Sequence, residues 1–192
     1  MQRLDEQKRK RILETAGRLF AERPFHEVRL EDVAAEAHIG KGTIYIYFQS
    51  KADLCFSLLL ESMVEVINAT RAEAAAAGTA PLQKIERLVH TFMPFTKRLM
   101  YLRSLERELG LQPEQMQALE EKRLELLGLV EGVLREGIAA GEIDDPHPDL
   151  TSRYLLAIFR EITYFPSPDA TPDVLMAHIL HVLRRGILKR AP

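Results

Sequence analysis

Hydroxyl and amino groups are concentrated in the segment GKGTIYIYFQSKADL, residues 40–54. Thr43 and Tyr47 carry hydroxyls, and Lys51 follows them with an ammonium group. Hydroxyls, cations and backbone amides are the groups with which proteins bind phosphate oxygens. Gly42 adds a position without a side chain, where the backbone can come close to a ligand. The residue types indicate a phosphate-binding surface, whose use depends on the element that carries it.

The same segment could form a strand or a helix, and the two would present different side chains. Residues 43–48, TIYIYF, alternate between two faces and are rich in β-branched and aromatic residues, as in a half-buried strand. A strand, however, needs a partner for its backbone hydrogen bonds, and the sequence offers no second strand candidate. We therefore predict a short helix over residues 41–48, with Ile44 and Phe48 pointing inward.

Two further helices are predicted before this one. Apolar residues recur at helical spacing from Ile12 to Phe20, and Pro24 ends that helix. The pattern repeats over residues 30–37 and is followed by a tight turn. Three helices with a tight turn between the second and third form a helix-turn-helix, which lays its last helix in the major groove of DNA.

This arrangement divides the outward side chains into two groups. Thr43, Tyr47 and Lys51 are expected to bind phosphates, as is the N-terminal end of the following long helix. Lys41 can reach the acceptors of guanine, and Ile46 can pack on a thymine methyl group. Tyr45, at the flank of the helix, is a third candidate for a base contact.

The rest of the chain is also predicted to be helical. Ser50 is a suitable N-cap for a long helix that ends at Gly78. Further helices are expected over residues 81–95, 102–109, 113–141, 148–165 and 172–190. Pro94 is expected to kink or end the first of these.

The expected fold class is all-α, with about nine helices. An N-terminal three-helix helix-turn-helix domain is predicted over residues 1–51 and continues into the long helix to about residue 68. Residues 52–192 are predicted to form a helical bundle for ligand binding and dimerisation.

Composition excludes several classes of protein. Hydrophobic residues make up 46% and charged residues 28%, and no apolar run approaches the roughly 20 residues of a membrane span. We expect no signal peptide, and the single cysteine, Cys55, fits a reducing cytoplasm. His178 and His181 share a helix face but lack an evident third metal ligand. Without a phosphate-cradling loop, a nucleophile elbow or a defensible acid–base pair, we expect no metal, no cofactor and no enzymatic activity.

Residues 12–58 resemble the DNA-binding domain of the TetR (tetracycline repressor) family of bacterial transcriptional regulators. The matching stretches are ILETAGRLF, residues 12–20, and VAAEAHIGKGTIYIYFQSKADL, residues 33–54. The resemblance implies DNA contacts, chiefly to phosphate, from Thr43, Tyr45, Tyr47 and Lys51. It places Lys41, Gly42 and Ile46 at the base-reading surface.

The chain departs from the family pattern at a few positions. Arg29 stands where the family has a Ser or Thr cap, so it loses the cap but can still hold a phosphate. His38 replaces a turn glycine and is expected to need a left-handed backbone, and Gly40 replaces a capping serine. Glu31 stands where some members place a base-reading side chain, and its carboxylate could accept only from cytosine.

The last two helices are expected to pair two copies of the chain. Residues 150–165 are apolar nearly all round and the final helix has a broad apolar stripe, so both need covering. We predict a two-fold homodimer through these helices. The middle helices, about 52–141, are implied by the resemblance to enclose an effector pocket. Candidate lining residues, for each of which an ordinary core position is the alternative, are Phe92, Met93, Phe95, Met100 and Tyr101.

The resulting hypothesis is a ligand-responsive regulator that binds double-stranded DNA. We expect a repressor that a small, largely apolar effector releases from a palindromic operator, with no membrane partner. A helix-turn-helix factor without an effector is the first alternative. An all-helical enzyme is the second, and the sequence offers it no catalytic constellation.

Overall fold

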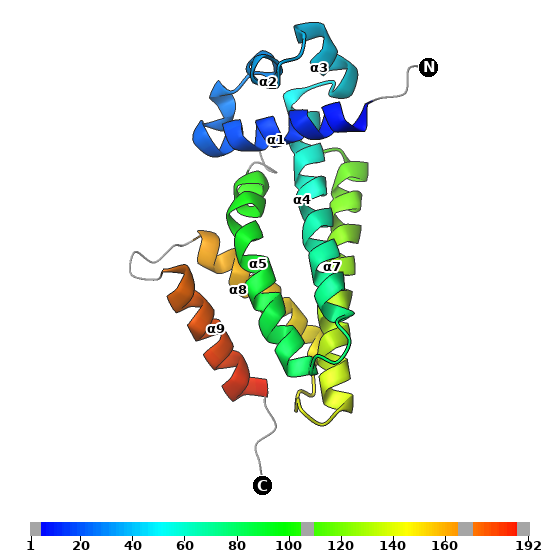
Figure 1. Ribbon diagram of the computed structural model, residues 1–192, viewed down its shortest axis with the longest axis vertical. Helices are drawn as coiled ribbons and strands as arrows, with labels where there is room; N and C mark the ends of the chain where they lie inside the picture. The colour runs from blue at the N-terminus through cyan, green and yellow to red at the C-terminus, as the bar shows by residue number, and fades with distance from the viewer. Residues whose placement is uncertain (1–4, 105–109, 165–170, 188–192) are drawn as a thin grey trace. The chain divides into compact units, whose positions relative to one another are not determined.

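The computed structural model describes residues 5–104, 110–164 and 171–187 (Figure 1). Within these ranges the chain forms α-helices and one short 3-10 helix, η1, and contains no β-strand. The elements are α1 Glu6–Glu22, η1 Phe25–Glu27, α2 Leu30–Glu36, α3 Lys41–Tyr47, α4 Lys51–Ala74, α5 Pro81–Ser104, α7 Pro113–Ala139, α8 Pro148–Tyr164 and α9 Pro172–Ile187. The all-α prediction is confirmed. None of the described helices is long and apolar enough to cross a membrane.

The helix predicted over residues 81–95 extends further than expected, because α5 continues for ten residues beyond Pro94 to Ser104. Of the two outcomes expected at Pro94, the end of the helix is wrong, and a kink stays a prediction. The helix predicted over residues 102–109 does not begin at residue 102, because residues 102–104 belong to α5, and its remaining residues lie outside the described ranges. Within those ranges the structure has eight α-helices, in agreement with the expected fold class.

The chain divides into two compact units. The first comprises Met1–Ser62 and Tyr101–Gln117, and the second Met63–Met100 and Ala118–Pro192. The first unit contains α1, α2 and α3 and the part of α4 up to Ser62. The functions expected of the two parts stay predictions.

The first unit is organised around the apolar face of α1. Its carboxylate cap, Asp5, accepts hydrogen bonds from the backbone amides of Gln7 and Lys8 at 3.0 and 3.1 Å. The helix ends just before Pro24, as predicted. Its buried residues pack with those of α2, α3 and the first turns of α4, and the fully buried members include Ile12, Leu13, Phe20, Ile44, Phe48, Leu54 and Leu59.

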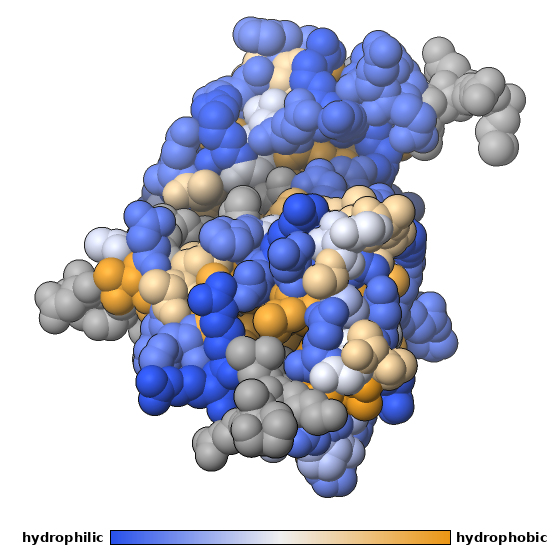
Figure 2. Space-filling model, turned by 60° about the horizontal axis from the view of Figure 1, so that its bottom comes forward, coloured by the Kyte–Doolittle hydropathy of each residue, from blue (hydrophilic) through white to orange (hydrophobic). Residues whose placement is uncertain are grey.

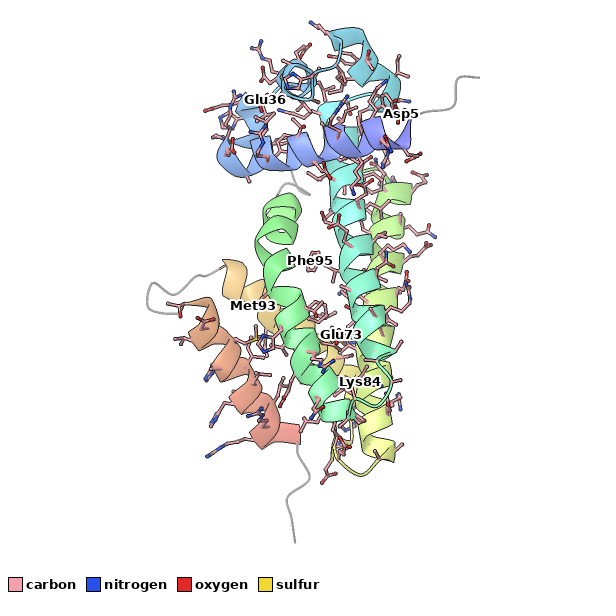
Figure 3. The ribbon with its side chains drawn as sticks, in the orientation of Figure 1. Asp5, Glu36, Glu73, Lys84, Met93 and Phe95 are labelled. Atoms are coloured by element: carbon pink, nitrogen blue, oxygen red, sulfur yellow. The ribbon has the colours of Figure 1, made fainter. Side chains whose placement is uncertain are left out.

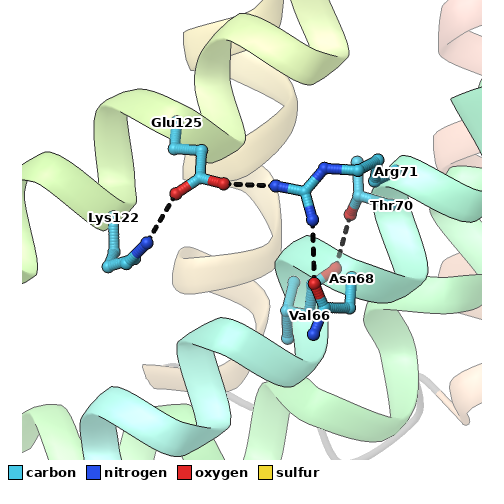
Figure 4. Close-up of polar contacts among 6 residues, drawn as sticks. All are labelled: Val66, Asn68, Thr70, Arg71, Lys122 and Glu125. Atoms are coloured by element: carbon cyan, nitrogen blue, oxygen red, sulfur yellow. Dashed lines mark hydrogen bonds and ion pairs between the residues drawn. The ribbon is translucent and has the colours of Figure 1, made fainter.

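The second unit has a continuous apolar core formed by α5, α7, α8, α9 and the end of α4. Its central members, each nearly inaccessible to solvent, include Ile67, Ile85, Leu88, Val130 and Leu134. Polar contacts join the helices around this core. The guanidinium of Arg71 on α4 binds Glu125 on α7, which also accepts from Lys122 at 2.7 Å, and Arg71 donates to Asn68 at 2.8 Å (Figure 4).

Gly137 lies where α7 packs tightly against its neighbours. It is buried in α7, and a Cβ atom at this position would lie 2.5 Å from Cδ1 of Ile143 and 3.1 Å from Cβ of Pro81. Gly128 lies on the same helix, but a Cβ there would meet nothing within 4 Å. The two glycines therefore have different roles, one required by packing and the other only lowering helix propensity.

Alanine substitutions at these two glycines should have opposite effects. Gly137→Ala is expected to lower the free energy of unfolding by about 1–3 kcal/mol, because Ile143 must shift in a filled core. Gly128→Ala is expected to raise it by about 0.5–1 kcal/mol through helix propensity. Urea denaturation followed by circular dichroism measures both. Equal effects of the two variants would contradict this interpretation of the packing.

Candidate nucleic-acid interface

The helix α3 is held in one rotational position by two buried side chains. Ile44 is 0% and Phe48 1% exposed, which confirms the predicted helix and its inward pair. The opposite side of α3 faces outward, and Ile46 is 64% exposed. Tyr45, at the flank, is 45% exposed. The exposed side chain of Ile46 is therefore available for contact with a partner.

The turn before α3 depends on an unusual backbone at His38. Its φ of 54° lies in the left-handed region, as predicted from the missing glycine. The amides of His38 and Ile39 donate to the carbonyls of Ala35 and Ala34 at 3.1 and 3.0 Å and so close the end of α2. Gly40 then caps α3, and the amide of Thr43 donates to its carbonyl at 2.8 Å.

At Gly42, in the first turn of α3, no side chain covers the backbone. A Cβ atom at this position would meet nothing within 4 Å, so the fold itself does not require glycine here. Together with Gly40, it leaves only Lys41 and Thr43 as side chains at this end of the helix. The backbone of α3 is therefore accessible from outside at its N-terminus, which is the end that a helix-turn-helix presents to a groove.

Glu31 on α2 binds two of the predicted base-reading residues. Its Oε1 accepts a hydrogen bond from the Tyr45 hydroxyl at 3.1 Å and lies 3.1 Å from Nζ of Lys41. Its own backbone amide, Lys41 and Tyr45, in that order, lower the pKa of Glu31. Glu31 correspondingly raises the pKa of Tyr45, because the phenol proton is held by a carboxylate. The sequence identified Glu31 only as a possible reader of cytosine, and its role between the two helices was missed.

The predicted phosphate ligand Tyr47 also fixes the start of α1. Its hydroxyl oxygen accepts a hydrogen bond from the backbone amide of Asp5 at 3.2 Å. That contact does not use the hydroxyl proton, so Tyr47 can still donate to a phosphate oxygen. Thr43 is half-buried beside it on α3. The two hydroxyls therefore lie along one edge of the outward face, about 40° apart on the helix.

Lys51 has a structural role that the sequence did not reveal. Its Nζ donates to the carbonyls of Phe25 and Val28 at 2.7 and 3.0 Å and lies 4.2 Å from the centre of the Phe25 ring. These bonds use two of the three ammonium protons, which leaves one for a phosphate. Lys51 thus ties the first turn of α4 to η1, and its phosphate contact stays a prediction.

Most charges around the helix-turn-helix are paired within the protein. On α2, Asp32 accepts from the Arg29 amide at 2.9 Å and lies 3.8 Å from Arg23, while Glu36 binds Arg18. Arg29 has no side-chain cap, as predicted, and its exposed guanidinium leaves the expected phosphate contact untested.

The basic segment at the start of α1 is also partly paired. Lys8 lies 4.0 Å from Asp5, and Lys10 lies 3.9 Å from Glu14. Arg9 binds Glu61 on α4, and its Cζ lies 5.7 Å from the centre of the Phe48 ring. This segment therefore has less free positive charge than its sequence indicates.

Three of the five residues predicted to line an effector pocket belong to the second unit's apolar core or its edge. Phe92 is 6% exposed, and Met93 and Phe95 are partly buried against the same core (Figure 3). Met100 and Tyr101 belong to α5, but their side chains lie outside the described part of the structure. Their role in ligand binding stays a prediction.

The remaining reactive groups offer no alternative site. Burial raises the pKa of the Cys55 thiol to about 12, so it is not a thiolate at neutral pH. His178 and His181 are both exposed on α9. Among the described side chains, no cluster of histidine, cysteine or carboxylate groups has the arrangement of a metal site.

Comparison with known proteins gives two family matches. Residues 12–58 match the family described as "Bacterial regulatory proteins, tetR family". Residues 78–187 match the "Tetracyclin repressor-like, C-terminal domain". Among relatives, the Fatty acid metabolism regulator protein of Bacillus subtilis (strain 168) is 29% identical over 184 residues, which cover 92% of this chain and 93% of the relative.

Solved structures share the fold along nearly the whole chain. A transcriptional regulator of the TetR/AcrR family from Thermobifida fusca YX-ER1 is 25% identical, with a TM-score of 0.80 over 94% of this chain and 98% of that chain. A protein from Saccharomonospora viridis, solved in complex with choline, is 23% identical, with a TM-score of 0.84 over 97% of this chain and 100% of that chain.

The two family matches agree with the geometry at both ends of the chain. The first coincides with the helix-turn-helix whose third helix exposes Ile46 and a bare N-terminal turn. The second alone spans more than half of the chain. The chain therefore belongs to the TetR family, and it is a DNA-binding transcriptional regulator, not an enzyme.

Proposed function

We propose that this regulator is a repressor that binds a palindromic operator as a homodimer and leaves it when a small, largely apolar molecule binds. The observation that supports this proposal most directly is the rotational position of α3 about its own axis. The burial of Ile44 and Phe48 turns Gly42 and Ile46 outward, with hydroxyls on one edge and Lys41 on the other. A helix with this distribution can enter the major groove and bind the phosphates on its flank.

The proposed contacts follow from the exposed groups on this face. Thr43, Tyr47 and the remaining proton of Lys51 bind phosphates, as does the exposed guanidinium of Arg29. Base edges are left to the other exposed positions of α3, which are Lys41, Gly42, Tyr45 and Ile46.

Removing the Tyr47 hydroxyl should weaken operator binding without unfolding the protein. Tyr47→Phe is expected to lower operator affinity about tenfold or more, because a hydrogen bond to a charged group contributes about 1.5–3 kcal/mol. Thr43→Ala should have a similar effect. Thr79→Ala removes a hydroxyl in the loop between α4 and α5, outside the proposed DNA and dimer surfaces, and is the control that should leave affinity unchanged. Fluorescence anisotropy measures the affinity of all three variants for a duplex that carries the inverted repeat found upstream of the protein's own gene. If Tyr47→Phe and Thr43→Ala bound this duplex as tightly as Thr79→Ala, the proposed contacts would be refuted.

The proposed dimer uses the exposed apolar side chains of α8 and α9. Leu150 and Tyr154 are 41% and 62% exposed on α8, one turn apart. Val174 and Val182 are 53% and 47% exposed on α9, two turns apart. On the face drawn in Figure 2, apolar residues reach the surface among hydrophilic ones. A second copy would cover these side chains, and its two-fold axis would set two α3 helices about 34–36 Å apart on a palindrome.

A charge in this surface should separate the two copies. Tyr154→Glu is expected to shift the protein to monomer, because pairing would then bury an unpaired carboxylate. Leu124→Glu adds the same charge at a side chain that is 50% exposed on α7, and should leave the dimer intact. Sedimentation equilibrium at micromolar concentration distinguishes the species. Dissociation by Leu124→Glu, with Tyr154→Glu still dimeric, would contradict the proposed interface.

The effector proposal rests on apolar side chains of α5 and on one relative. Phe92, Met93 and Phe95 provide adaptable apolar surface on α5, and one relative is named for regulating fatty acid metabolism. The alternative, a factor without an effector, is favoured by the packing of Phe92 within the core.

Binding of an apolar effector should stabilise the protein and release DNA together. A panel of fatty acids and their thioesters should contain a compound that raises the Tm and lowers operator affinity at least tenfold, since about 1.4 kcal/mol of differential affinity suffices for that change. Differential scanning fluorimetry and anisotropy give the two readings. A compound that raises the Tm without releasing the operator would count against the proposed repression mechanism. If no compound in the panel changed either the Tm or the operator affinity, the alternative of a factor without an effector would be favoured.

A further inference from the structure

The outward face of α3 has two edges of different chemistry. At about 100° per residue, Thr43 and Tyr47 lie along one edge, and Lys41 and Tyr45 lie along the other, which borders α2. The first edge carries hydroxyls with protons to donate. The second edge is occupied, because both of its polar groups bind Glu31.

Glu31 differs from the other two acidic residues of α2. The side chain of Asp32 lies near Arg23 at the end of α1, and Glu36 binds Arg18 within α1. Only Glu31, among these three acids, takes its partners from α3. Its carboxylate therefore acts on the helix that is proposed to contact DNA, whereas the other two join α2 to the region of α1.

All three groups of this cluster are accessible to solvent. The side chains of Glu31 and Lys41 are 36% and 72% exposed, and Tyr45 is 45% exposed. Ion pairs of this kind contribute little to folding stability. A contact with little structural value, placed on the binding face, suits a role in recognition.

Glu31 has a direct consequence for non-specific binding to DNA. Such binding grows with the number of lysines and arginines that can neutralise phosphates. A lysine whose ammonium already faces a carboxylate adds less of this attraction, and the carboxylate itself repels a phosphate backbone. Base edges, by contrast, offer amino groups that a carboxylate can accept from.

From this geometry we infer that Glu31 is a specificity-determining residue, which restrains Lys41 and Tyr45 and thereby suppresses sequence-independent binding to DNA. The inference rests on the proposed placement of α3 in the major groove. It assigns Glu31 an effect on the ratio of operator binding to random-sequence binding, which is the quantity that matters among competing genomic sites.

The test measures binding to a random-sequence duplex of about three helical turns as a function of salt concentration. Glu31→Gln should bind about fivefold more tightly at 0.1 M salt, the upper end of what an exposed charge pair contributes. Its plot of log K against log salt should steepen by about 0.9, as one more phosphate contact forms. The ratio of operator to random-duplex affinity should fall correspondingly.

Two further variants test whether the steeper salt dependence of Glu31→Gln comes from the release of Lys41 or only from the loss of one negative charge. Glu36→Gln removes the same charge from the same helix and should leave the slope unchanged, since its partner lies on α1. The double variant Glu31→Gln, Lys41→Ala should lose the added slope. Equal slopes for Glu31→Gln and Glu36→Gln, or a steep slope in the double variant, would overturn the inference while leaving the proposed function intact.

A measurement without DNA tests the contact itself. Titration of tyrosine ring carbons by NMR should show the Tyr45 pKa above its ordinary value and a fall on Glu31→Gln, because the phenol then loses the carboxylate that holds its proton. Tyr45→Phe assigns the signal. An unchanged Tyr45 titration would overturn the inference. Failure of the unmodified protein to bind either duplex at low salt would instead overturn the proposed function, and with it the inference that rests on it.

Discussion

The burial of Ile44 and Phe48 is the constraint on which the DNA-binding part of this protein depends. Burying two such side chains contributes about 1.5–3 kcal/mol each. The segment TIYIYF forms a helix in spite of its strand-like composition, because no strand among the described residues could pair with its backbone. Because the two anchors lie four residues apart, they define one side of α3 and fix what the other side presents. A rotation by one residue, about 100°, would turn Tyr45 inward and Ile44 outward.

Several polar groups hold the helix-turn-helix in shape before any ligand arrives. Lys51 joins α4 to the carbonyls of Phe25 in η1 and of Val28 just after it, and the Tyr47 hydroxyl accepts from the amide of Asp5, the N-cap of α1. Glu31 also connects α2 and α3, but through exposed contacts that contribute little to folding stability. In the proposed complex, Lys51 and Tyr47 would bind phosphates with protons that these internal bonds do not use. A surface fixed in this way loses less conformational freedom on binding, which favours affinity.

The sequence predicted elements well where a single local rule decided the outcome. Pro24 ended α1, Ser50 accepts from the Asp53 amide at 3.0 Å as the cap of α4, and the missing glycine at His38 produced a left-handed residue. Pro94 does not end its helix, which was one of the two outcomes expected there, because α5 continues through it to Ser104. A proline inside a helix loses one hydrogen bond, and packing of α5 against the core of the second unit can offset that loss.

The candidate site was predictable by residue type but not by contact. Thr43, Ile46 and Tyr47 could be placed on the outward side because helical spacing alone determines this. The partners of Lys51 are backbone carbonyls of a segment that lies more than twenty residues earlier, and carbonyls carry no signal in a sequence. The pairing of Glu31 with Lys41 depends on how α2 and α3 cross, which the turn at His38 fixes and the pattern of apolar residues does not.

The distribution of charge suggests why such a protein would act as a pair. The first 51 residues hold ten lysines and arginines against eight aspartates and glutamates, and many of these cations face a carboxylate of the same chain. One helix-turn-helix with so little free positive charge attracts DNA weakly. In the proposed dimer, once one helix-turn-helix has bound DNA, binding of the second becomes intramolecular. Two weak contacts then give a tight complex only while the spacing of the two helix-turn-helix units fits the operator. A ligand that favours another spacing of the two helix-turn-helix units would then release the DNA without contacting α3. Release would follow because each unit alone, with little free positive charge, attracts DNA weakly.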